Sequence, residues 1–460
     1  MKKEQDLTIG RIPITLIKFS IPLFVANLLQ SLYNIVDMAI VGRIVGSTGV
    51  AAISNASALV FIINALCIGI TMGGTVLIAQ YKGAGDRQGQ KETIGVVYFL
   101  TMVLSLLVMT IGLMAYRALL AAMNVPAESM QQAAEYMSVI LGGTFFVFGY
   151  NATCAVLRGL GDSVRPLVFV AIATVINIGL DYVFAGILGM GTVGAAYATV
   201  IAQGVSFVVS VVYLKKQAFV FDFKIKSFQI RRNKVLPVLR ISLPTAVQMT
   251  VVNVSYLIIA VMLNKYGVTI AAAAGIGLKI NTFAAMPCWA IGQAITTMAG
   301  QNMGAGLPER VEQIGRKGLR LNLLATLLTV IVIQVFAEQL IMFFDPANPE
   351  VISAGVRYLR ICCFFNSLVY ATMYSLDSFA VGIGAAGVAM FNALLDFALI
   401  RLTLCWFLSE VLSLGYEGIY WVQALSDIIP AIIGLLYFYS KRWQKKKLID
   451  TKVVWKKQIP

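Results

Sequence analysis

Twelve long apolar stretches run through this chain, and they limit its possible folds more than any other feature. Each is long enough to cross a bilayer, whose hydrocarbon core takes about 20 residues of helix. The stretches are expected at residues 16–41, 51–80, 93–116, 133–157, 164–188, 191–214, 236–264, 269–300, 317–343, 353–380, 384–409 and 415–440. This series predicts an all-α integral membrane protein with twelve transmembrane helices.

Composition and charge agree with a multi-pass membrane protein. The 460 residues are 59% hydrophobic and only 12% charged, with a formal net charge of +15. In a soluble protein that charge would suggest nucleic acid, but here the Lys and Arg residues gather at the N-terminus, in the even-numbered loops, in the central connection and in the C-terminal tail. Such a distribution sets topology. We therefore expect a cell-membrane protein with both termini in the cytoplasm and no nucleic-acid partner.

Several classes of chemistry are disfavoured by what the chain lacks. It has no histidine, and its six cysteines all fall inside expected spans, so neither a disulfide framework nor a zinc site is indicated. No P-loop and no nucleophile with a nearby base can be found in the sequence. An integral membrane enzyme is therefore a remote alternative. We expect no cofactor, and we expect an ion gradient to supply the energy for any transport.

The chain repeats itself. IKFSIP at 17–22 recurs as LRISLP at 239–244, and AQYKGAGDRQGQ at 79–90 recurs as GQNMGAGLPERVEQ at 300–313. Each half holds six spans, and an even number returns the chain to the same side, so the two six-helix bundles form a parallel, pseudo-symmetric 6+6 repeat. The expected parts are an N-lobe at 1–214, a basic linker at 215–235, a C-lobe at 236–440 and a basic tail at 441–460.

Two carboxylates lie inside spans of the N-terminal half. Asp37 is on the first span and Asp181 on the fifth, and a charge inside hydrocarbon costs at least ~2.5 kcal/mol. Asp37 is near enough to the end of its span that it could reach water. However, both spans run outward, which places Asp37 ~6 Å and Asp181 ~10 Å from the outer end at the helical rise. Two carboxylates at similar depth in one bundle can meet.

Three further polar side chains are expected at the same depth. Asn177 is one turn before Asp181 on the same helix face, Thr199 enters on the sixth span, and Tyr136 lies near the start of the fourth. Taken singly, each could serve only in a hydrogen bond between helices. Around two carboxylates they predict a site for a shared proton or for a hard cation such as Na⁺, with Asp37, Asn177 and Asp181 as its ligands. Asn151, which falls nearer the inner end, is a weaker candidate.

The chain resembles the multidrug and toxic compound extrusion (MATE) family. The 6+6 duplication, the paired Q-x-x-G-A-G motifs, the L-R-G-L-G-D segment at 157–162 and the N-x-x-x-D of the fifth span carry this resemblance over nearly the whole chain. In the second half, LDSFAVGIG at 376–384 departs from the family's R-G-x-G. Five residues match the family's N-lobe cation positions one by one: Asp37, Tyr136, Asn177, Asp181 and Thr199.

The resemblance implies a secondary antiporter. Such a protein exports small organic compounds, cationic or amphipathic, in exchange for H⁺ or Na⁺ by alternating access, as a monomer in contact with membrane lipids. The resemblance also implies that the first span bends at Pro22 when the acidic site changes occupancy. Because Pro22 recurs as Pro244, a bend needed only for packing is the alternative. A flippase for lipid-linked precursors, from the same superfamily, is the rival function.

Comparison of the two halves of the repeat distinguishes residues of the shared scaffold from residues that occur in one half only. In the second half, Asp37 falls opposite Ile258 or Ile259 and Asp181 opposite Cys405, so the acidic pair occurs once. The C-lobe spans hold a different set of charges, two of each sign: Lys279, Asp377, Asp396 and Arg401. We expect these four to cancel in a structural ion-pair network lining the central cleft that the two bundles are expected to enclose, with substrate contact as the alternative.

Overall fold

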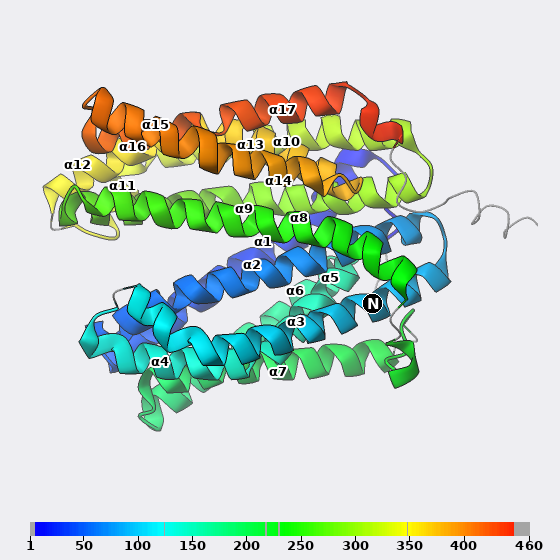
Figure 1. Ribbon diagram of the computed structural model, residues 1–460, viewed down its shortest axis with the longest axis horizontal. Helices are drawn as coiled ribbons and strands as arrows, with labels where there is room; N and C mark the ends of the chain where they lie inside the picture. Colours follow the sequence, from blue (N-terminus) through cyan, green and yellow to red (C-terminus); the bar gives the residue numbers. More distant parts are fainter. Residues whose placement is uncertain (1–4, 124, 217–218, 229–230, 347, 446–460) are drawn as a thin grey trace, which may run out of the picture. The chain divides into compact units, whose positions relative to one another are not determined.

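The computed structural model describes residues 5–123, 125–216, 219–228, 231–346 and 348–445, and within them the chain is almost entirely helical (Figure 1). Eleven helices in this part of the chain are long and apolar enough to cross a membrane. The pair α4 (Ala127–Gly142) and α5 (Thr144–Gly159), bent by 54° at their junction, makes a twelfth. The predicted all-α membrane fold is confirmed, and the expected fourth span is a bent one.

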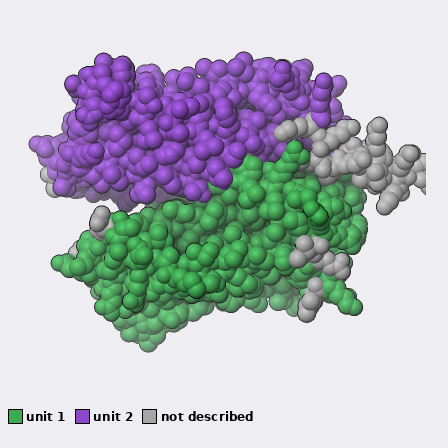
Figure 2. All heavy atoms as spheres, in the orientation of Figure 1, with its two compact units in different colours: residues 1–5, 25–246 green, residues 6–24, 247–460 purple. Residues whose placement is uncertain are grey.

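Two compact units divide the chain, and they are coloured separately in Figure 2. Unit 1 comprises residues 1–5 and 25–246, and unit 2 comprises residues 6–24 and 247–460. The helices α1 (Ile12–Ile44) and α8 (Arg232–Asn264) therefore each begin in one unit and end in the other. The lobes expected at 1–214 and 236–440 stay a prediction, and they differ from these units in the first halves of α1 and α8.

Unit 1 is built around α2, which packs against α3, α4 and α5, while α7 packs against α4, α5 and α6. These helices follow in order: α2 (Ser47–Gly83), α3 (Arg87–Ala122), α4, α5, α6 (Val164–Asp181) and α7 (Gly191–Lys216). The segment L-R-G-L-G-D starts α6, because the Asp162 carboxylate accepts hydrogen bonds from the Val164 and Arg165 amides at 3.0 Å. A π-helical segment (Tyr182–Ile187) continues α6 beyond Asp181.

The first half of α8 lies directly on α2 within unit 1. The Ser242 hydroxyl donates to the Ile70 carbonyl at 2.8 Å, and a Cβ atom on Gly73 would lie 2.5 Å from the Val238 carbonyl oxygen. Only a residue without a side chain permits such an approach. In hydrocarbon, helix association depends on close packing and hydrogen bonds of this kind. This contact therefore fixes the start of α8 to unit 1.

Unit 2 repeats the plan, with α9 packed against α10, α12 and α13. Its longer helices are α9 (Val268–Gly304), α10 (Pro308–Val335), α12 (Pro349–Tyr358), α13 (Ser367–Gly382), α14 (Ala386–Leu394), α16 (Gly415–Leu425) and α17 (Ile428–Tyr439). The shorter pieces are α11 (Ala337–Met342), α15 (Leu402–Trp406) and three π-helical segments, Leu359–Asn366, Leu395–Arg401 and Phe407–Val411. The first half of α1 joins this unit, where Leu16, Phe19 and Leu23 share a core with Ala290 and Ala294 of α9.

The internal repeat is visible in the backbone itself. Gly85 and Gly306, which close the two G-A-G motifs, have φ angles of 72° and 71°. Gly161 and Gly384 have φ angles of 87° and 85°, although the second belongs to the segment that departs from the family's sequence pattern. Positive φ is a conformation that glycine adopts without steric cost. The same turns are therefore built in both halves.

The described part of the basic linker is docked on unit 1. The Phe221 side chain is fully buried, in a cluster with Tyr98 and Ile78, and the Lys91 ammonium lies 2.8 Å from the Asp222 carboxylate. This ammonium and a hydrogen bond from the Ser227 hydroxyl hold the pKa of Asp222 well below its usual range. Residues 217–218 and 229–230 of the linker, residues 446–460 of the tail and the lysines at positions 2 and 3 lie outside the described residues.

Candidate functional site

The predicted N-lobe residues come from five helices of unit 1, and all are buried except Asn151, which is on α5. Asp37 is on the second half of α1, Tyr136 on α4, and Thr199 on α7. Asn177 and Asp181 are one turn apart on α6, and both are fully buried, while Asp37 is 6% exposed. Asp181 ends the α-helical part of α6 and precedes its π-helical segment, a distortion frequent at functional sites.

A hydrogen bond and electrostatic contact bring the set together. The Tyr33 hydroxyl on α1 donates to the Thr199 hydroxyl on α7 at 2.9 Å. Asp37 lies within electrostatic reach of Asp181, and Tyr33 and Tyr136 both lie within reach of the two carboxylates. Four helices therefore present oxygen atoms to one buried region of unit 1.

Several polar atoms of this region have no hydrogen-bond partner within the described ranges. They are one carboxylate oxygen of Asp37, both carboxylate oxygens of Asp181, and the oxygen and nitrogen of the Asn177 amide. Buried polar atoms without partners are rare, and those that occur call for an explanation such as a bound ion or water. Carboxylate and amide oxygens are the ligands that hard cations prefer, and the same carboxylates can share one proton.

The donor set suits Na⁺ or H⁺ better than a transition metal. Among the described residues, no three His, Cys, Asp or Glu side chains gather into a metal-binding group. Asp37 and Asp181 would hold Na⁺ together with the Asn177 amide oxygen, which is the ligand set that the sequence predicts. A single Na⁺ or proton there would neutralise the charge of one of the two carboxylates.

Asn151 is placed differently from the other predicted residues. It is half-buried on α5, and its amide nitrogen donates to the Val147 carbonyl of the same helix at 2.8 Å. No described contact joins it to Asp37 or to Asp181. Its hydrogen bond is that of a polar side chain satisfied within its own helix.

Tyr33 is a residue of the site that sequence reasoning missed. It lies four residues before Asp37, and side chains at this spacing share one face of a helix. It lies within the apolar run from Leu16 to Val41, where a single tyrosine does not stand out. The spacing to Asp37 is the signal that could have found it.

In unit 2, Arg401 is the centre of a buried ion-pair network. Its guanidinium lies 3.0 Å from the Asp396 carboxylate and 3.5 Å from the Asp427 carboxylate. It also donates to the Ser255 and Ser426 hydroxyls at 3.1 and 3.0 Å. A predicted network therefore exists around Asp396 and Arg401, and it includes Asp427, which sequence reasoning missed.

The other two predicted C-lobe charges do not join that network, and here the prediction was wrong. Lys279 is exposed and forms no ion pair with any described residue. Asp377 is buried, but it accepts hydrogen bonds from two amides, those of Asn392 and Gln248, rather than from a cation. The prediction assumed that two positive and two negative side chains would pair. It failed because Lys279 lies on an exposed face of α9, whereas the carboxylates are in the interior.

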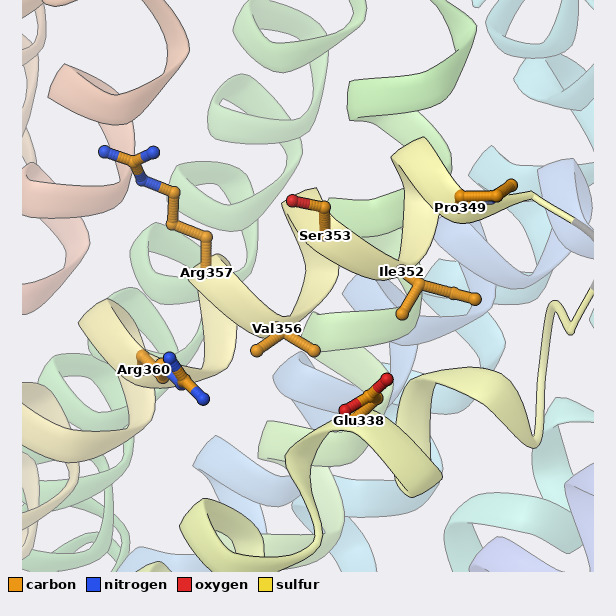
Figure 3. Close-up of a pocket in the computed structure, with 7 residues that line it drawn as sticks. All are labelled: Glu338, Pro349, Ile352, Ser353, Val356, Arg357 and Arg360. Carbon is orange, nitrogen blue, oxygen red and sulfur yellow. The ribbon is translucent and has the colours of Figure 1, made fainter.

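Unit 2 also contains a cavity of about 590 Å³ (Figure 3). Figure 3 shows Glu338 on α11 facing the helix that carries Ile352 and Val356. Arg357 of the same helix is paired with Glu417 at 2.7 Å. The full lining is Glu338, Pro349, Ile352, Ser353, Val356, Arg357 and Arg360. None of the predicted site residues contributes to it.

Comparison with known proteins decides the family. The MatE family model matches residues 22–183 and again residues 244–407, once in each half of the repeat. The chain belongs to the MatE family. This MatE protein is 29% identical to the "Probable multidrug resistance protein YpnP" of Bacillus subtilis, over 98% of this chain and 100% of that one. It is 28% identical to the "Probable multidrug resistance protein NorM" of Thermotoga maritima, over 94% of each chain.

Solved structures agree on the fold. A chain described as the "Outward-facing conformation of a multidrug resistance MATE family transporter of the MOP superfamily" aligns with a TM-score of 0.90 at 23% identity, covering 97% of this chain and 100% of that one. The MatE protein is thus a multi-pass membrane transporter of small organic compounds, of a family of multidrug efflux transporters rather than enzymes. Members of this family are ion-coupled and need no cofactor. The flippase alternative is not favoured.

Proposed function

We propose that this MatE transporter is a secondary antiporter that exports cationic or amphipathic organic compounds in exchange for H⁺ or Na⁺. The coupling ion binds in the N-lobe at Asp37 and Asp181, with Asn177, Tyr136 and Thr199 around them. The observation that carries the proposal is the buried carboxylate pair. Three of its four carboxylate oxygens have no hydrogen-bond partner among the described residues. Intramembrane carboxylates of this kind mark ion or proton pathways.

Coupling requires that the ion binds two conformations with different affinity, since equal affinity shifts no equilibrium. The N-lobe region can supply this difference because its ligands come from α1, α4, α6 and α7, so a small shift of one helix changes the oxygen set. Pro22 removes the hydrogen bond to the Lys18 carbonyl of α1. In this proposal α1 bends at Pro22 when the ion binds or leaves.

Several finer properties belong to the same proposal. The protein resides in the plasma membrane as a monomer, with both termini in the cytoplasm and its basic linker and tail near anionic lipids. The chain's 18 methionines and 25 phenylalanines suit an adaptable surface for bulky substrates. A reporter fused to each end in turn, active on one side of the membrane only, tests the topology.

Transport into proteoliposomes tests the function. A pH gradient and a Na⁺ gradient are imposed separately, and uphill movement of a fluorescent organic cation is followed. We expect accumulation under at least one of the two gradients. Absence of accumulation under both gradients would overturn the antiport proposal.

A further inference from the structure

Asp377 is a buried carboxyl group that the N-lobe account does not use. It lies on α13, is 4% exposed, and accepts hydrogen bonds from the Asn392 amide at 2.7 Å and from the Gln248 amide at 3.4 Å. No ion pair of Asp377 is present in the part of the chain that the structure describes. Its hydrogen-bond partners among the described residues are thus neutral amides on α14 and α8.

The interior charges of unit 2 do not balance. Among the described residues of unit 2, three carboxyl groups are buried, Asp377, Asp396 and Asp427, against one buried cation, Arg401. Arg401 is already engaged by Asp396 and Asp427. An ionised Asp377 would therefore be a surplus negative charge inside the membrane, which is costly, and a buried carboxyl group without a cation takes up a proton instead.

Asn392 gives independent evidence for a proton at this position. Its side chain is fully buried and directed at Asp377, yet its amide oxygen has no hydrogen-bond partner among the described residues. A protonated carboxyl group can pair with a side-chain amide through two hydrogen bonds, accepting from the amide nitrogen on one oxygen and donating its hydroxyl to the amide oxygen from the other. A proton on Asp377 would therefore satisfy an acceptor that an ionised Asp377 leaves unpaired.

Among the described residues, no cation is paired with Asp377. Tyr374, one turn away on α13, and Asp427, just before α17, are in electrostatic contact with it. The other fully buried titratable groups on the elements packed against α13 are the thiols of Cys288 on α9 and of Cys362 and Cys363 on the π-helical segment before α13. The described polar residues Asn322 on α10 and Asn392 on α14 do not titrate. Every titratable group named here is neutral or acidic.

Gln248 connects Asp377 to a helix that belongs to both units. The chain of α8 passes from unit 1 to unit 2 between Ala246 and Val247, so Gln248 is the second residue of α8 inside unit 2. Pro244, four residues earlier, removes a backbone hydrogen bond from this part of α8. We propose that Asp377 is a proton-binding site of the C-terminal half, held by Asn392 and Gln248, whose protonation state sets the contact between α13 and α8.

The proposal does not depend on the N-lobe site, and its test removes that site. The full chain carrying Asp37→Asn and Asp181→Asn is placed in lipid nanodiscs, with and without Asp377→Asn, and infrared spectra are recorded from acid to alkaline pH. We expect a protonated-carboxyl band at neutral pH that Asp377→Asn abolishes and that alkaline pH removes. Identical carboxyl bands in the two proteins at every pH would overturn the proposal, while leaving the N-lobe account untouched.

Melting temperature gives a second test in the otherwise unchanged chain. Asparagine imitates a neutral, protonated aspartate, so Asp377→Asn should melt at the wild-type temperature at neutral pH. Arg401→Gln, which strips the cation from Asp396 and Asp427, is the matched control and should melt at a lower temperature. If Asp377→Asn lowers the melting temperature as much as Arg401→Gln does, Asp377 is needed as a charged group, contrary to the proposal.

Discussion

The Tyr33 hydroxyl of α1 donates a 2.9 Å hydrogen bond to the Thr199 hydroxyl of α7, beside the buried carboxylates of Asp37 and Asp181. This bond joins α1, the helix that carries Asp37, to α7. It also lies on the part of α1 beyond Pro22, the part that belongs to unit 1. Tyr33 is therefore placed to transmit ion binding to α1.

Tyr33→Phe removes this bond and leaves the ring in place. We expect a modest loss of stability, about 0.5–1.5 kcal/mol, together with a weaker dependence of transport on the coupling ion. Tyr98→Phe is the matched control, because Tyr98 and Thr153 form a buried 2.9 Å bond in the same unit. Thermal unfolding and transport across an ion titration are measured for both. Equal effects on ion dependence in the two variants would show that Tyr33 has no special role.

Gly73→Val tests the close packing of α8 against α2. The new side chain would meet the Val238 carbonyl and Ser242, and overpacking of this kind costs about 1–3 kcal/mol. Gly275→Ala on α9 is the control, because no atom lies within 4 Å of a Cβ at Gly275. We expect Gly73→Val to lower the melting temperature and Gly275→Ala to leave it unchanged or raise it. A wild-type melting temperature for Gly73→Val would show that α8 can move off α2 without cost.

Arg401→Gln should be among the most damaging single changes in unit 2. It leaves the buried carboxylates of Asp396 and Asp427 without a cation, and breaking a buried pair in this way costs about 3–5 kcal/mol. Arg357→Gln breaks an exposed pair with Glu417 and should cost at most about 1 kcal/mol. Denaturation of the purified variants in parallel compares the two. Similar losses for both would mean that the Arg401 network is as weak as a surface pair.

The docked linker should loosen in acid. The pKa of Asp222 is lowered by Lys91 and Ser227, so its stabilising contact is fully present above the unfolded aspartate pKa of about 4 and is lost as the pH falls through the lowered folded value. Hydrogen exchange of residues 219–228, corrected for the intrinsic effect of pH, follows the change. Lys91→Met should loosen the same segment already at neutral pH. Exchange that is independent of both pH and Lys91 would contradict this account.

Much of the fold follows from the sequence, and the exceptions have physical causes. Apolar length and the repeat predict the spans, because a helix must cover the hydrocarbon thickness whatever its neighbours are. The bend between α4 and α5 and the exchange of the first halves of α1 and α8 between units depend on packing, which apolar length does not report. Asp37 and Asp181 stand out in apolar runs. Asp427 stands out in the same way, inside the span expected at 415–440, and could have been included. Tyr33 does not stand out, because its role arises from a contact between two helices.

The most direct test of the central claim compares exchange with uphill transport in proteoliposomes containing Asp181→Asn. Substrate exchange without a gradient reports the conformational cycle, and accumulation driven by a pH or Na⁺ gradient reports coupling. The account predicts that Asp181→Asn still exchanges substrate but no longer accumulates it under either gradient. The joint C-lobe replacement of Asp396 and Arg401 should retain gradient-driven accumulation. If Asp181→Asn accumulates substrate at the wild-type rate while the C-lobe variant loses ion dependence, the coupling site is in the other half.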